Sequence, residues 1–84
     1  MDLRDTEYAR EIAAVEHGEA RIERLYVKNE DQEEIRFSWW KDGKLMMRPL
    51  DLPENDLLVL LEKALDKDIF SSEFKYRLIK MLMK

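Results

Sequence analysis

Few side chains in this sequence could do chemistry, and the single histidine, His17, is the first to consider. An imidazole can act as a general acid or base near neutral pH when a pocket and an orienting partner are present. His17 directly precedes Gly18 at the end of a segment with helical spacing, and the sequence offers it no evident partner. We therefore interpret His17 as a residue favoured by the dipole at a helix C-terminus.

Other catalytic equipment is missing from the composition. The absence of cysteine excludes disulfides and thiolate metal sites, and two glycines are too few for the known phosphate-binding loops. The carboxylates of Asp66 and Asp68, and those between Asp51 and Asp56, lack the spacing of a calcium loop. We expect no catalytic residue, no metal and no cofactor, and the protein is predicted not to be an enzyme.

One group of residues suggests binding, provided that the strands expected at residues 22–28, 34–40 and 44–49 pair in a particular register. If Val27 lies opposite Ile35 across a five-residue loop, one face of the sheet is apolar. That face carries Leu25, Val27, Ile35, Phe37, Trp39, Leu45 and Met47. The other face is basic and aromatic, and it carries Arg24, Tyr26, Lys28, Glu34, Arg36, Ser38, Trp40, Lys44, Met46 and Arg48. The residues predicted to bind a partner are Tyr26, Arg36, Trp40, Lys44, Met46 and Arg48.

The turn at residues 41–43 bears on the same register. A two-residue Asp-Gly loop would place Trp39 beside Met46 and mix apolar with charged side chains. A three-residue loop with Gly43 in the left-handed conformation places Trp39 beside Leu45 and keeps one face apolar, so we predict the three-residue loop. Pro49 lacks a backbone donor, which makes this third strand an edge of the sheet.

The elements that position these residues follow from hydrophobic periodicity. Residues 6–16 have apolar side chains at helical spacing and are predicted to form a helix that ends at Gly18. Near residue 53 a second helix is predicted to begin with a capping box from Asp51 to Glu54, and its broad leucine face implies deep burial on the sheet. Ser71 or Ser72 is expected to cap a last helix. The fold class is α+β in the order α-β-β-β-α-α, with a three-stranded antiparallel meander packed on one face by two C-terminal helices.

Length and composition indicate one small domain over residues 1–84, divided into an N-terminal helix at 1–18, a meander at 20–49 and a helical hairpin at 53–84. The lack of cysteine, of an apolar leader and of a spanning segment predicts a cytoplasmic protein without membrane contact. We expect residues 35–84 to form a compact module of a bacterial or phage type.

Three functions remain open. The favoured one is a non-catalytic interaction or regulatory protein that acts through a partner protein, or through a homodimer formed by the edge strand. The second is a single-stranded nucleic-acid-binding domain that uses the basic-aromatic face, although the net charge of −4 disfavours it. The third is an acidic inhibitor that imitates nucleic-acid charge, because residues 1–34 hold eleven acidic and five basic residues. The residues expected to supply that charge are Glu7, Glu11, Glu16, Glu19 and Glu23. The N-terminal helix could also lie across the basic face and neutralise it.

Overall fold

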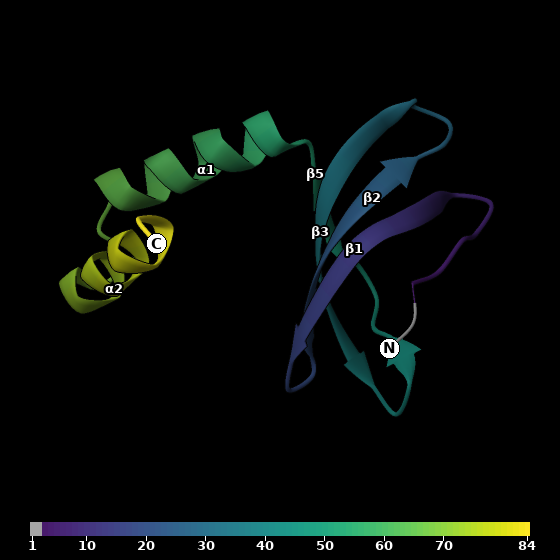
Figure 1. Ribbon diagram of the computed structural model, residues 1–84, viewed down its shortest axis with the longest axis horizontal. Coiled ribbons are helices and arrows are strands. Elements are labelled where there is room, and N and C mark those ends of the chain that lie inside the picture. Colours follow the sequence, from purple (N-terminus) through teal and green to yellow (C-terminus); the bar gives the residue numbers. More distant parts are fainter. Residues whose placement is uncertain (1–2) are drawn as a thin grey trace.

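The computed structural model describes residues 3–84, which form an antiparallel sheet followed by two helices (Figure 1). The elements are β1 (Ala9–His17), β2 (Ala20–Val27), β3 (Gln32–Lys41), β4 (Lys44–Leu45), β5 (Leu50–Leu52), α1 (Glu54–Asp66) and α2 (Ser72–Leu82). Strands β1 to β4 are neighbours in sequence order, and β5 pairs with β3 further along its length than β4 does. The α+β class, the antiparallel sheet and the two C-terminal helices agree with the sequence analysis. Met1 and Asp2, which the single-domain prediction included, lie outside the described residues.

The predicted N-terminal helix at residues 6–16 is wrong, because this segment forms the long strand β1. It pairs antiparallel with β2 along its whole length, from Ala9 opposite Val27 to His17 opposite Ala20. The register shifts between Glu11 and Ala13, and a bulge of this kind inserts one extra residue into a strand. That extra residue gives the apolar side chains of β1 a spacing close to that of a helix. His17 therefore ends a strand and has no helix dipole to cap.

The predicted register between the second and third expected strands is also wrong. The structure pairs Val27 with Gln32 and Leu25 with Glu34, across a short loop that ends at Asp31. Compared with the expected pairing of Val27 and Ile35, this is a shift by an odd number of residues, which moves one strand's side chains to the opposite face. Ile22 consequently lies opposite Phe37, while Leu25 and Val27 share their face with charged residues of β3.

The turn after β3 is the two-residue Asp42-Gly43 loop that the sequence analysis rejected. Lys41 pairs with Lys44, and Asp42 and Gly43 have φ angles of 52° and 77°, as a tight hairpin turn requires. Gly43 is left-handed as expected, but in a shorter loop. The chain then leaves the sheet after Leu45 and returns as β5, so the expected strand at residues 44–49 is interrupted.

The return of β5 restores an apolar pairing on β3. Leu50 lies opposite Phe37, and Leu52 lies opposite Ile35. The prediction that this third strand is an edge is confirmed, because both β4 and β5 pair with β3 alone.

The start of α2 agrees with the sequence analysis, whereas the start of α1 differs from it. Ser71 caps α2 as predicted, with its hydroxyl oxygen accepting a hydrogen bond of 3.1 Å from the Phe74 backbone N–H. The capping box at Asp51 is wrong: Pro53 occupies the cap position of α1 and makes no side-chain cap. Asp51 lies instead in β5, where it pairs with Arg36.

The helices form an arm that stands away from the sheet, and we call residues 54–82 the helical arm (Figure 1). Its base contacts β3 through α1. The deep burial expected for the leucine face of α1 does not occur, since neither helix contains a buried residue. The Cα radius of gyration is 14.6 Å, whereas a compact domain of this length would have about 12 Å. No helix among residues 3–84 is both long and apolar enough to cross a membrane.

Candidate interaction surface

The face of the sheet that is turned away from the helical arm, which we call the charged face, is built around the guanidinium of Arg21. The pairing of β2 with β1 and β3 brings three carboxylates to this one cation. Arg21 donates to Glu11 at 2.9 Å and to Glu16 at 2.6 Å, and its Nε lies 3.5 Å from Glu23 Oε2. Arg4 adds a second cation at 3.0 Å from Glu11. The side chains of Arg21, Glu11 and Glu23 are almost completely buried.

Two carboxyl groups of this face have pKa values shifted in opposite directions. Burial disfavours the charged form of both groups. For Glu11 burial is outweighed by hydrogen bonds with Glu23 and Arg4 and by the charge of Arg21, which lower its pKa from 4.5 to about 2. For Glu23 burial and the nearby Glu11 raise the pKa above its ordinary value. The network therefore stabilises the charged form of Glu11 and disfavours the charged form of Glu23.

Trp40 and Arg36, both predicted to bind a partner, lie on this charged face and are engaged within the chain. The indole of Trp40 lies under the Arg4 guanidinium, 4.6 Å from its ring centroid, and its Nε1 donates to Ser38 at 3.1 Å. Arg36 is buried and donates twice to Asp51, at 2.7 and 2.8 Å. Both side chains thus hold residues of the same chain together.

The other predicted binding residues lie elsewhere. Tyr26 is on the opposite face, where its hydroxyl donates to Asp31 and its ring lies under Arg10. Lys44 and Met46 follow the β3–β4 turn, and the exposed Arg48 lies in the segment between β4 and β5 with a φ of 62°. The structure therefore does not bring the six residues together on one face, and their role in binding stays a prediction.

Several cations of the expected basic face are also neutralised. Arg24 forms ion pairs with Glu33 and Glu54, and Lys28 forms one with Asp5. In the folded chain, these cations of the expected basic face are therefore paired with carboxylates.

The face of the sheet that is turned toward the helical arm, which we call the apolar face, is the surface that the sequence analysis missed. It turns hydrophobic side chains outward from all of the longer strands and from β5. Trp39 is 50% exposed and Ile22 is 45% exposed. The face consists of Val15, Ile22, Ile35, Phe37, Trp39, Leu50 and Leu52. A signal for it was present in the alternation of Ile35, Phe37 and Trp39, but their cross-strand partners were misassigned.

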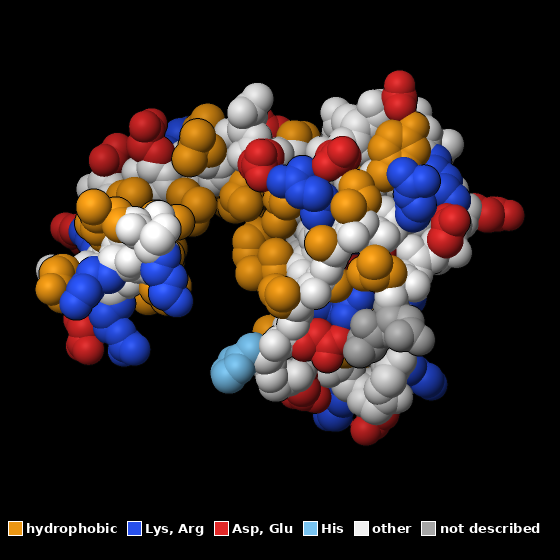
Figure 2. All heavy atoms as spheres, viewed as in Figure 1, with side chains coloured by type: hydrophobic (Ala, Val, Ile, Leu, Met, Phe, Trp, Pro, Cys, Tyr) orange, Lys and Arg blue, Asp and Glu red, His pale blue; other side chains and the backbone are white. Residues whose placement is uncertain are grey.

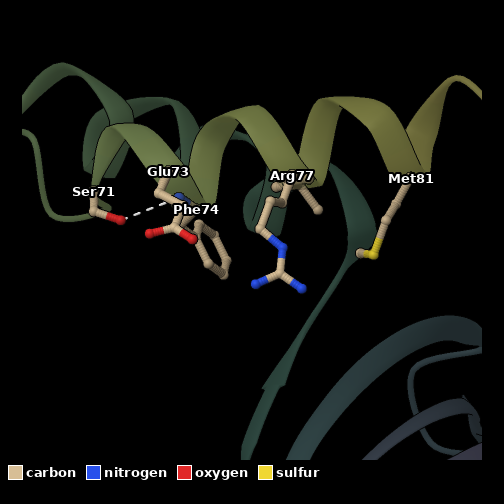
Figure 3. A pocket seen from close by; sticks show the side chains of 6 residues that line it. Ser71, Glu73, Phe74, Arg77 and Met81 are labelled. Atoms are coloured by element: carbon tan, nitrogen blue, oxygen red, sulfur yellow. Dashed lines mark hydrogen bonds between the residues drawn. The ribbon is translucent and has the colours of Figure 1, made fainter.

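The helical arm presents a second apolar surface. Figure 2 shows hydrophobic side chains on both sides of the hollow between the arm and the sheet. One side of α2 lines a groove of about 470 Å³ with the side chains of Phe74, Arg77 and Met81 (Figure 3). A further groove of about 330 Å³ runs along α1 beside Leu57, Leu58 and Leu61. Hydrophobic side chains thus occur on both walls of the hollow, and Glu73 and Arg77 add charged groups to the groove of α2.

The amount of exposed surface is large for a chain of this size. The accessible surface is 7097 Å², whereas a folded monomer of 10.2 kDa has about 5,300 Å². The excess is about 1,800 Å². Among residues 3–84, the apolar residues classed as buried are Ala9, Leu25 and Val27. Most of the hydrophobic content therefore lies on the apolar face and on the arm, where it is free to contact another molecule.

Within the described part of the chain, no cluster of three or more histidine, cysteine or acidic side chains could hold a metal ion. Comparison of the chain with known protein families, with curated proteins and with solved structures finds no match.

Proposed function

We propose that this protein is a non-catalytic interaction module that acts by binding a protein partner through the apolar face and the helical arm. The observation that carries this proposal is the exposure of large hydrophobic side chains on the apolar face and the arm, in a chain whose accessible surface exceeds that of a folded monomer of the same mass by about 1,800 Å². Contiguous apolar patches on monomeric proteins rarely exceed a few hundred Å². Larger ones typically mark sites where another macromolecule binds.

A protein partner accounts for this surface better than a nucleic acid does. Binding to single strands needs unpaired cations beside exposed aromatic rings. Here Arg24, Lys28 and Arg36 are engaged with carboxylates of the same chain. The exposed ring of Trp39 lies instead opposite Ala20 and on the same face as Ile22 and Phe37, an apolar setting that matches a protein surface.

Imitation of nucleic-acid charge also has less support. Of the acidic residues considered for it, Glu11 and Glu23 are buried around Arg21, and Glu16 pairs with the same cation. Glu7 and Glu19 alone are a sparse substitute for a row of phosphates.

The proposal is tested by measuring whether Trp39 is accessible to a quencher. In the variant Trp40→Phe, the fluorescence of Trp39 is titrated with iodide at the lowest readable protein concentration, and the particle mass is measured in parallel. If the particle has the mass of one chain, 10.2 kDa, we expect Trp39 to be quenched readily. If Trp39 is shielded, we expect the particle to be larger than one chain. The variant Trp39→Phe serves as the control, because Trp40 is held by Arg4 and Ser38 and should respond equally at every concentration. A shielded Trp39 in a single-chain particle would mean that the apolar face belongs to the protein's own core, and the proposed function would be wrong.

A further inference from the structure

We infer that the partner of the apolar face is a second copy of this chain, with the helical arm of each copy lying on the apolar face of the other. This inference rests on the proposed function and names the molecule that covers the same surface. Four features of the structure lead to it.

The first feature is the geometry at the base of the arm. Pro53 has φ −57° and ψ 148° and is the single residue between β5 and α1. Glu54, the first residue of α1, forms an ion pair with Arg24 of β2, and α1 contacts β3. These contacts hold the start of α1 at the sheet while the rest of the arm projects from it (Figure 1). Closing the arm onto its own sheet would need a rearrangement at this short, anchored junction.

The second feature is that both halves of the missing contact occur in one chain. The hollow is lined by apolar side chains on the sheet and on the arm (Figure 2), so each copy offers one arm and one apolar face. A two-fold axis lets each arm enter the hollow of the other copy, because such an interface is self-complementary. This arrangement covers the apolar face and the helical arm of both copies at once, so no further protein is needed to cover them.

The third feature is the area. If each copy buries its excess of about 1,800 Å², the dimer buries about 3,600 Å² in total, which lies in the range of obligate homodimers. A chain of 84 residues with so few buried apolar residues also needs a further source of stability, which oligomerisation provides.

The fourth feature is the distribution of charge. Residues 72–84 carry four cations and one acidic residue, whereas residues 3–34 carry ten acidic and five basic residues. The arm as a whole carries six acidic and five basic residues, so the attraction to residues 3–34 of another copy comes from α2 and the residues that follow it. Opposite potentials of this kind speed association and fix orientation.

The first test is the mass of the protein in solution, measured by sedimentation over a range of concentrations. We expect twice 10.2 kDa at micromolar concentration. The variants Trp39→Glu, on the apolar face, and Met81→Glu, in the groove of α2, are each expected to weaken dimerisation at least 100-fold. Tyr76→Glu is the matched control, because Tyr76 and Met81 are both 61% exposed and Tyr76 lies on the other side of α2 by helical spacing. It should leave the mass unchanged.

The second test is complementation between the two variants. Each mutant homodimer has damage in both of its arm–sheet contacts. A mixed dimer joins the intact arm of Trp39→Glu to the intact sheet of Met81→Glu, so one contact is undamaged. We expect mixing to recover at least tenfold of the lost affinity. Complementation also shows that both variants are folded, and Trp39→Ala replaces Trp39→Glu if circular dichroism shows that the latter has lost its sheet.

Three results would overturn the inference, and they have different consequences for the proposed function. A wild-type particle of 10.2 kDa at every concentration, with Trp39 accessible, would exclude the second copy but leave the apolar face as a binding surface. The same mass with Trp39 shielded would overturn both. A dimer that persists in both Trp39→Glu and Met81→Glu would place the interface elsewhere, for example at a sheet edge.

Discussion

The guanidinium of Arg36 and the carboxylate of Asp51 lie opposite each other on β3 and β5 and share two hydrogen bonds, of 2.7 and 2.8 Å. Both side chains are largely buried, with 10% and 17% of their surface exposed. The pair links β3 to β5, the strand that leads into α1. It therefore helps to set where the helical arm leaves the sheet.

Asp51→Asn is expected to destabilise the protein, because it leaves the buried Arg36 without its counter-charge. Breaking a pair of this kind costs about 3 kcal/mol of unfolding free energy. Urea denaturation at a fixed protein concentration measures the effect. The control Asp66→Asn changes an exposed aspartate at the end of α1 and should alter stability by less than about 0.5 kcal/mol. Equal effects of the two substitutions would contradict a structural role for the pair.

The charged face predicts unequal effects for its two buried glutamates. Glu11→Gln removes the carboxylate on which both Arg4 and Arg21 converge and should cost about 3 kcal/mol at neutral pH. Glu23→Gln neutralises a group whose charged form is already disfavoured, and it should stay within about 1 kcal/mol of wild type. Ser38 can still donate to the amide oxygen of Gln at this position. The prediction is wrong if Glu23→Gln proves the more damaging of the two.

The pH dependence of stability follows from the opposite pKa shifts. The pKa of Glu11 is lower in the folded state than its ordinary value of 4.5. The unfolded chain therefore takes up this proton first as the pH falls, so the contribution of Glu11 is complete above pH 4.5 and is lost towards pH 2. The pKa of Glu23 is raised, so its ionisation lowers stability as the pH rises through its folded-state pKa.

These signs are checked by differences between wild type and variants across the acid range. The stability advantage of wild type over Glu11→Gln should shrink steadily from pH 4.5 downward. The stability of Glu23→Gln relative to wild type should instead improve as the pH rises above 4.5. A Glu11→Gln difference that stays constant between pH 4.5 and 2 would show that Glu11 is not the stabilising anion.

Arg48 has a left-handed backbone, with φ at 62°, in the segment that carries the chain from β4 to β5. This conformation is strained for residues with a Cβ atom and free for glycine. Arg48→Gly is expected to be about 1 kcal/mol more stable than Arg48→Ala. Because both substitutions remove the same cation, the comparison separates backbone strain from any role of Arg48 in binding. Equal stability of the two would mean that the segment relaxes.

Local sequence signals predicted the parts of the fold that depend on local physics. Strict alternation identified β3, and helical periodicity identified both C-terminal helices. The hydroxyl of Ser71 marked the start of α2, as a side chain that competes for backbone N–H groups should. The edge position of β4 agrees with the prediction, but Pro49, on which that prediction was based, lies between β4 and β5 and belongs to neither strand.

The local sequence signals failed where the insertion or loss of a single residue changes the secondary structure or the face on which a side chain lies. The bulge beside Ile12 gave β1 the spacing of a helix. In a continuous strand, the two-residue turn at Asp42 and Gly43 would mix charged with apolar residues on one face. The chain avoids this by leaving the sheet after Leu45 and returning at Leu50. Asp51 had the spacing of a helix cap, and the tertiary fold used it to pair with Arg36 instead.

Local sequence patterns are enough to specify an α+β chain with a long alternating strand, an edge strand and two amphipathic helices. These features depend on the chemistry of neighbouring residues, and every register of the sheet would retain them. The tertiary structure decided which residues share a face. By placing Ile22 opposite Phe37 and Glu23 opposite Arg36, it buried the charges within the chain and turned the hydrophobic side chains outward. Side chains alternate with a period of two along a strand, so a shift of the register by an odd number of residues moves one strand's side chains from one face of the sheet to the other. No local pattern could decide between the two registers.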